Sequence, residues 1–321
     1  MCFFSLLIFL GVRYVLNSLK STIKNWWLKD LNIKQRKMVW AYIFLLVPLI
    51  FYLSIRIYPV FKAFRLSLME WDLVGSQEFV GLDNFRELFD DAIFWRSLAN
   101  TGKYLLGLPI SLVIGFIFAY LLSKIEFAFG FFRLIYFLPY LTSLVAVAWI
   151  FRWILQPLPL GLANRFLSFM GLSSYHFLED TTLALPSILA ATIWQGLGFQ
   201  IIIYLAGLKG IPKQLYEAAE VDGANEFQRL FKITLPLLKP TFVFLIVIGS
   251  IRYLRMFAQV LNMSYQGRGG PAYSTMTLVL FLYRRAFEHF EMGYAAAATL
   301  ILFLIIMTVS LIQLKVLSGD D

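Results

Sequence analysis

Residues 217–236 read EAAEVDGANEFQRLFKITLP and lie in a polar segment that separates two apolar runs of membrane length. A short amphipathic helix at its start would expose two alanines beside the acid Glu217. Gly223 can adopt a positive φ, which lets the chain turn. Pro236 can occupy the first turn of a new helix, where its missing N–H is not needed. This arrangement predicts a protruding helix that docks into a groove on another protein.

The composition is that of a membrane protein. Of the 321 residues, 60% are hydrophobic and 15% are charged, and the mean hydropathy is +0.74. Soluble domains are usually about 45–50% apolar and about 25% charged. The net charge of +9 fits basic cytoplasmic loops better than nucleic-acid binding, so we expect no nucleic-acid partner. The single cysteine permits no internal disulfide, and the histidines, His176 and His289, lack ligand spacing, so we expect no metal site.

Six apolar runs are long enough to cross a bilayer as helices. We place these spans at residues 38–59, 100–122, 134–155, 185–208, 237–260 and 294–314. Strand edges exposed to lipid cannot satisfy their backbone groups, so the predicted fold is an all-α, polytopic membrane helical bundle with six core transmembrane helices. Lysines and arginines are denser on the side that holds both ends of the core and the loop 209–236, which makes that side cytoplasmic.

The N-terminal residues 1–37 are set apart from a core domain of residues 38–321. Residues 2–12 are apolar but too short to span a bilayer alone, and no basic stretch precedes them as in a secretory signal. Residues 17–37 place two tryptophans among lysines, which is the pattern of a helix lying at the interface against anionic lipid. We expect an apolar tail followed by an interfacial amphipathic segment. A seventh span reaching to Leu19 is the alternative.

The segments predicted on the opposite side are longer and mix aromatic with polar residues. Residues 61–98 suggest short amphipathic helices, and residues 156–184 suggest a loop with one brief helix. Residues 267–271 read GRGGP, which predicts a flexible turn before an amphipathic stretch at 274–290. Together these segments would form a rim on which a receptor docks. Alternatively, they are ordinary loops that rest on the membrane.

Residues 38–314 resemble the sugar-permease branch of the membrane subunits of type I ABC importers. The spacing of the EAA loop is met in full: E-A-A, three residues, G, nine residues and I-x-L-P. Further matches are FVGLDNF at 79–85, NT at 100–101, YFLP at 136–139, WQGLGF at 194–199, LAGL at 205–208, IP at 211–212, GGP at 269–271, ST at 274–275, YR at 283–284 and MGYA at 292–295. An amino-acid or ion permease would share only the EAA loop, so this set favours saccharide cargo.

The resemblance implies an importer in the inner membrane of a bacterium. A second permease subunit, a dimer of ATP-binding ATPase subunits and an extracytoplasmic substrate-binding protein would complete it. The residues implied to meet the ATPase are Glu217, Ala218, Ala219, Asp222 and Gly223. The chain contains no GxxxxGK[ST] phosphate loop, so ATP and Mg are expected on the partner and no cofactor on this chain. The chain is therefore expected to be a non-catalytic subunit.

In the implied fold, the helices corresponding to residues 185–208 and 237–260 line the cargo cavity. Arg252 and Arg255 are three residues apart, on one face of a helix. Arginine within a span is costly and usually faces a cavity or a partner charge, and it suits bidentate contact with carboxylate or phosphate. We expect an anionic saccharide, such as an alginate-like uronate oligosaccharide or a sugar phosphate. The alternatives are arginines that snorkel outward or pair with acids of the partner permease, with neutral oligosaccharides or glycerol phosphates as cargo.

Other side chains expected along the pathway could hydrogen-bond sugar hydroxyls or stack on sugar faces. They are Gln195, Gln200, Tyr204 and Gln259, with the aromatic residues Phe199, Tyr253 and Phe257. A channel or a membrane-embedded enzyme is a more distant alternative. The sequence shows no pore-loop signature and no cluster of His, Asp or Glu within the spans.

Overall fold

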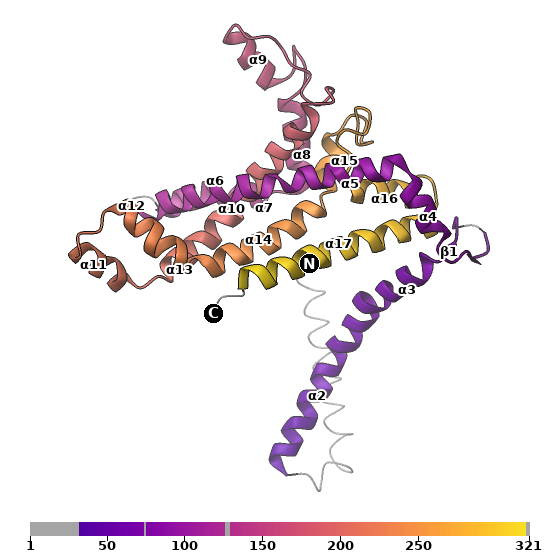
Figure 1. Ribbon diagram of the computed structural model, residues 1–321, viewed down its shortest axis with the longest axis horizontal. Helices are drawn as coiled ribbons and strands as arrows, with labels where there is room; N and C mark the ends of the chain where they lie inside the picture. The colour runs from indigo at the N-terminus through magenta and orange to yellow at the C-terminus, as the bar shows by residue number, and fades with distance from the viewer. Residues whose placement is uncertain (1–31, 74, 126–128, 319–321) are drawn as a thin grey trace, which may run out of the picture. The chain divides into compact units, whose positions relative to one another are not determined.

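The computed structural model of the chain describes residues 32–73, 75–125 and 129–318 (Figure 1). Most of the predicted tail and interfacial segment, residues 1–31, lies outside the described residues. The described chain is helical apart from one small sheet, which confirms the all-α class. It divides into two units with a boundary between Lys62 and Ala63.

The first described helix contains the predicted span 38–59 and is longer than that span. Three elements, α2 (Ile33–Tyr52), the π-helical turn η1 (Leu53–Ile57) and α3 (Tyr58–Leu66), form one continuous helix of 34 residues. A capping box at Asn32 starts it, because the side chains of Asn32 and Gln35 satisfy the first free backbone N–H groups. No residue in its most apolar window is buried.

Three more predicted spans coincide with long apolar helices. They are α5 (Ala92–Leu105) continued by α6 (Gly107–Ser123), α10 (Ala184–Lys209) and α17 (Met292–Ser318). Among the described residues, four helices are long and apolar enough to cross a membrane. The number rises to six if each of two bent helix pairs counts as one span.

The predictions of single helices over 134–155 and 237–260 are wrong. The first run is divided into α7 (Phe129–Leu141) and α8 (Leu144–Ile154), which meet at 95° just after Pro139. Proline removes one backbone donor, and the polar pair that follows it begins a new helix. In the second run, α14 (Lys239–Leu254) ends early and a short helix, α15 (Ala258–Met263), follows a break.

The packed core of the second unit surrounds α10, which contacts both α6 and α7, while α14 contacts α17 (Figure 1). Glycines allow the closest approach. A Cβ at Gly198 would collide with the backbone of α7 at Tyr136, so only glycine fits there. The core itself consists of large buried side chains, such as Tyr104, Ile188 and Leu245. Gly198 therefore allows α10 and α7 to pack closely against each other.

The segments predicted to lie outside the cytoplasm contain the brief helices that the sequence suggested. The first carries a hairpin of β1 (Met69–Glu70) and β2 (Glu78–Phe79), then α4 (Asp83–Asp90). The second carries α9 (Leu162–Phe169), and the third carries α16 (Leu278–Phe287).

The turn around residues 267–271 is hydrogen-bonded on both sides: the Gly269 N–H donates to the Ser264 hydroxyl at 3.0 Å, and the Thr275 hydroxyl donates to the Gly270 carbonyl at 3.1 Å. Thr275 is fully buried nearby, and the Asn100 side chain donates hydrogen bonds to the carbonyls of Tyr273 and Met276 at 2.8 and 3.1 Å. These contacts satisfy backbone groups that a flexible loop would leave to water. Distant side chains therefore fix the loop, and no local pattern reports them.

Candidate functional site

The loop that opened the sequence analysis forms a helix, a tight turn and a second helical run. Its elements are α11 (Lys213–Val221), α12 (Glu226–Arg229), the π-helical turn η2 (Leu230–Thr234) and α13 (Leu235–Leu237). Gly223 has a φ of +76°, as predicted. Its N–H donates to the carbonyl of Glu220 at 3.0 Å, and the N–H of Ala224 donates to that of Ala219 at 2.8 Å. This is a Schellman turn, which stops α11 at a defined residue.

Several side chains of α11 are open to the surroundings of the subunit. Glu217 and Ala218 are exposed, Ala219 is half-buried, and Asp222 is the last, capping residue of the helix. Val221 is 88% exposed. An acid beside exposed apolar and small residues is the surface expected of a helix that docks into a groove.

Pro236 lies in the first turn of α13, as the sequence predicted, but α13 continues the helical run that begins at Glu226. Residues 226–237 form one helical run, and the bend of 61° comes at Leu238. Pro240 occupies the first turn of the helix that follows this bend, α14. The π-helical turn η2 lies immediately before Pro236, and such a turn accommodates the missing proline N–H without ending the helix.

Polar contacts connect the loop with the ends of the membrane helices. Glu226 pairs with Lys124 at the end of α6, and the Tyr120 hydroxyl donates to the same carboxylate at 3.2 Å. Within the loop, the hydroxyls of Tyr216 and Thr234 are 2.9 Å apart. Glu226 thus connects α12 with α6, and Tyr216 connects α11 with the second helical run of the loop. Motion of the loop would therefore be transmitted to α6.

Arg252 and Arg255 line one cavity of about 450 Å³, together with Phe257, Gln259 and Leu144. The two arginines do not share a helical face, because α14 ends at Leu254 and Arg255 is its non-helical cap. Arg255 is exposed and Arg252 is half-buried. The cavity thus brings together four of the residues that the sequence placed on the pathway.

Within the described ranges, the hydrogen-bond partners of the Arg252 guanidinium are neutral groups. It donates to the side-chain oxygen of Gln195 and, at 3.4 Å, to the carbonyl of Thr192. Among the described residues, neither Arg252 nor Arg255 forms an ion pair. A half-buried cation without a counter-ion favours binding of an anion from outside the chain.

The remaining pathway candidates do not line this cavity. Gln200 donates to the Ser111 hydroxyl at 3.0 Å inside the core. Tyr204 is fully buried between aromatic rings, and Tyr253 is almost fully buried. Phe199 stacks on Tyr140 with ring centres 5.2 Å apart. In this conformation these side chains pack within the subunit, and their contact with cargo stays a prediction.

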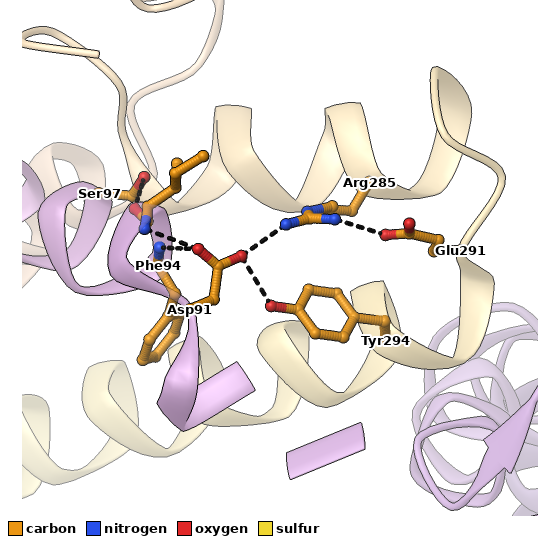
Figure 2. Close-up of polar contacts among 7 residues, drawn as sticks. Asp91, Phe94, Ser97, Arg285, Glu291 and Tyr294 are labelled. Atoms are coloured by element: carbon orange, nitrogen blue, oxygen red, sulfur yellow. Dashed lines mark hydrogen bonds and ion pairs between the residues drawn. The ribbon is translucent and has the colours of Figure 1, made fainter. Parts of the chain in front are cut away.

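A polar cluster that the sequence did not reveal joins three helices, α5, α16 and α17, at their ends away from the loop 209–236 (Figure 2). The Asp91 carboxylate accepts from Arg285 at 2.5 Å, from the Tyr294 hydroxyl at 3.0 Å and from the N–H of Ile93 at 2.6 Å. Arg285 also pairs with Glu291 at 2.9 Å. Burial raises the pKa of Asp91, but the Ile93 N–H, the Tyr294 hydroxyl and the Arg285 charge outweigh it and hold the pKa below its usual value.

A helix-start signal was present at Asp91, since an acid directly before an apolar run is a common N-cap. Its partners Arg285 and Tyr294 follow 194 and 203 residues later. No local pattern connects positions so far apart.

Comparison with known families decides the identity of the chain. The model of the inner membrane component of binding-protein-dependent transport systems matches residues 107–318, which is more than half of the chain. The chain belongs to this family. The permease is 36% identical over 279 residues to the probable ABC transporter permease protein YesP of Bacillus subtilis, covering 86% of this chain and 89% of that protein.

A second relative and a solved transporter carry names that mention saccharides. The arabinooligosaccharides transport system permease protein AraP of Bacillus subtilis is 36% identical over 284 residues, covering 86% of each chain. A bacterial ABC transporter involved in import of the acidic polysaccharide alginate matches with a TM-score of 0.77 and 26% identity, covering 89% of this chain and 97% of that chain. In complex with a periplasmic protein bound to an alginate pentasaccharide, that transporter matches with a TM-score of 0.76 and 26% identity, covering 88% and 96%.

The permease is thus a multi-pass membrane protein of the sugar-permease branch of ABC importers, as the sequence motifs predicted.

Proposed function

We propose that the permease forms half of the translocation pathway of an ATP-driven importer for acidic oligosaccharides, such as uronates. A second permease would form the other half, and an extracytoplasmic binding protein would deliver the cargo. ATP and Mg would bind to an ATPase dimer that meets α11 on the cytoplasmic side. The exposed surface of Glu217, Ala218 and Val221 supports this contact.

One observation carries the choice of acidic cargo. Arg252 and Arg255 line a single cavity, and neither has an acidic partner among the described residues. A saccharide carboxylate would supply the missing counter-ion, and charge-assisted hydrogen bonds to arginine are short and strong. The resemblance to the alginate transporter supports the same choice. Phe257 lies in the cavity wall, where it could stack on a sugar face.

The test is stimulation of ATPase activity in the complete transporter, reconstituted with its partner permease, ATPase and binding protein. We expect uronate oligosaccharides to stimulate the wild type. The changes Arg252→Gln and Arg255→Gln should each lower kcat/KM for uronate uptake by about 10- to 100-fold, since a hydrogen bond to a charged group contributes about 1.5–3 kcal/mol. Lys315→Gln, which removes an exposed cation near the end of α17, should leave uptake unchanged.

Neutral oligosaccharides are the second candidate cargo, favoured by the name of the relative AraP. Stimulation by neutral oligosaccharides alone, with uronates inactive, would overturn the acidic assignment. Equal uronate uptake by the wild type and by both arginine variants would show that these side chains do not recognise the charge of the cargo.

A further inference from the structure

A second cavity, of about 920 Å³, lies between the loop 209–236 and the ends of two membrane helices. Its wall includes Lys124 at the end of α6 and Lys209 at the end of α10, with Lys213 of α11 and Arg229 of α12. Two basic residues therefore come from the membrane helices and two from the loop. The transport function described above assigns no ligand to this cavity.

The cavity wall is basic, because four cationic side chains and one acidic side chain line it. Glu226 is the acidic residue in the wall, and it pairs with Lys124. Arg229 pairs with Glu220 from outside the wall, at 3.3 Å. Lys213 forms no ion pair with any residue of the described ranges. A cavity with this excess of ammonium and guanidinium groups favours an anion with several acceptor oxygens.

The rest of the wall indicates what kind of anion fits. Leu208 and Ile211 add an apolar side to this basic wall. The helices α6 and α10 both belong to candidate membrane spans, so the cavity lies where those spans end. Basic pockets at this level between membrane helices bind anionic lipid headgroups. A molecule with a phosphate and an acyl chain matches both sides of the wall.

We propose that this cavity binds the phosphate group of an anionic phospholipid. The phosphate would lie between the basic residues of the loop and those of α6 and α10, and it would reduce the repulsion between them. Binding would stabilise the position of α11 relative to the membrane helices. The cytoplasmic location of the cavity rests on the proposed function, but the binding chemistry does not. A soluble phosphate is the other source of the same group.

The experiment measures binding of short-chain phosphatidylglycerol to the complete, detergent-purified transporter, with short-chain phosphatidylcholine and inorganic phosphate as comparison probes. The test variant is Lys209→Gln with Lys213→Gln. The control is Lys232→Gln with Lys239→Gln, which removes the same charge from neighbouring exposed lysines outside the cavity wall. We expect the test variant to raise Kd for phosphatidylglycerol by about 25-fold, or roughly fivefold for each lysine, and the control to leave Kd unchanged.

Three results would decide the question. Phosphatidylglycerol binding that the test variant alone weakens supports a phosphate site filled by lipid. Equally tight binding of inorganic phosphate, weakened by the same variant, supports the phosphate site and assigns its source to the solution. Equal weakening by both double variants, or no binding of either phosphate compound, overturns the site. Because the readout is binding, it is independent of cargo choice and of ATPase coupling.

Discussion

Asp91 connects the ends of three helices in the second unit. One carboxylate oxygen caps α5, and the other meets Arg285 of α16 and Tyr294 of α17. The side chain is 11% exposed, so water screens these contacts only weakly. Loss of its charge would leave Arg285 with Glu291 alone, which is more exposed.

At the residue scale we predict that Asp91→Asn lowers the free energy of unfolding by about 2 kcal/mol. Asparagine remains a good N-cap, so the change isolates the charge from the cap. The measurement is Tm of the purified permease in detergent. Asp83→Asn is the matched control, because Asp83 pairs with Arg86 at a surface where both side chains are largely exposed. That control should change stability by less than about 1 kcal/mol. Equal effects of the two changes would contradict the role of Asp91.

The same residue predicts a pH dependence. The pKa of Asp91 is lower in the folded state than its usual value, because the Ile93 N–H, Tyr294 and Arg285 together outweigh the effect of burial. Its contribution to stability is therefore complete above the unfolded pKa of about 3.9 and is lost as the pH falls through the folded value. The difference in Tm between wild type and Asp91→Asn should stay constant from neutral pH down to about 5 and shrink below about 4. A constant difference through this range would show that the charge is not responsible.

At the element scale the loop 209–236 depends on one backbone angle. Gly223 has a φ of +76° and open space around its α-carbon, so a side chain there meets strain but no collision. We predict that Gly223→Val, at a cost of about 1–2 kcal/mol, displaces α11 and uncouples ATP hydrolysis from transport, while membrane insertion is unchanged. Gly223→Asn should retain most coupling, since asparagine tolerates this conformation. The measurement is transport per ATP hydrolysed in proteoliposomes.

The control for that prediction is Gly102→Ala in α5, where a side chain also meets open space but the backbone is ordinary helix. It should leave coupling unchanged. Loss of membrane insertion in Gly223→Val would indicate a folding role for the turn rather than a role in coupling.

The membrane helices show which structural information the sequence contains. Hydropathy locates a span, because apolar length is a property of consecutive residues. It therefore predicted α10 and α17 closely. The bend after Pro139 has a local signal, the proline and the polar pair that follows it, which hydropathy does not report. The early end of α14 has no such signal in its apolar run. For the same reason the sequence brought Arg252 and Arg255 into one site but assigned them the wrong backbone geometry.

At the scale of the whole molecule, the proposed function requires two chemically distinct ends. The loop 209–236 carries an exposed acid, exposed apolar side chains and a basic cavity behind them. The opposite ends of the helices carry α9, α16 and the Asp91 cluster. An importer needs its energy source on one side of the membrane and its cargo supply on the other, so these ends must face different compartments.

The last prediction tests this orientation directly. Cysteine is introduced at Val221 or at Phe169, which are 88% and 89% exposed, after replacement of the single native cysteine by serine. In right-side-out vesicles, a membrane-impermeant maleimide should label Phe169→Cys at once and Val221→Cys only after permeabilisation. Because both positions are equally open in the subunit, the difference measures membrane side rather than burial. Photo-crosslinking from position 221 should then capture the ATPase, and position 169 should not. Immediate labelling of Val221→Cys would place α11 outside and exclude its contact with an ATPase in the cytoplasm.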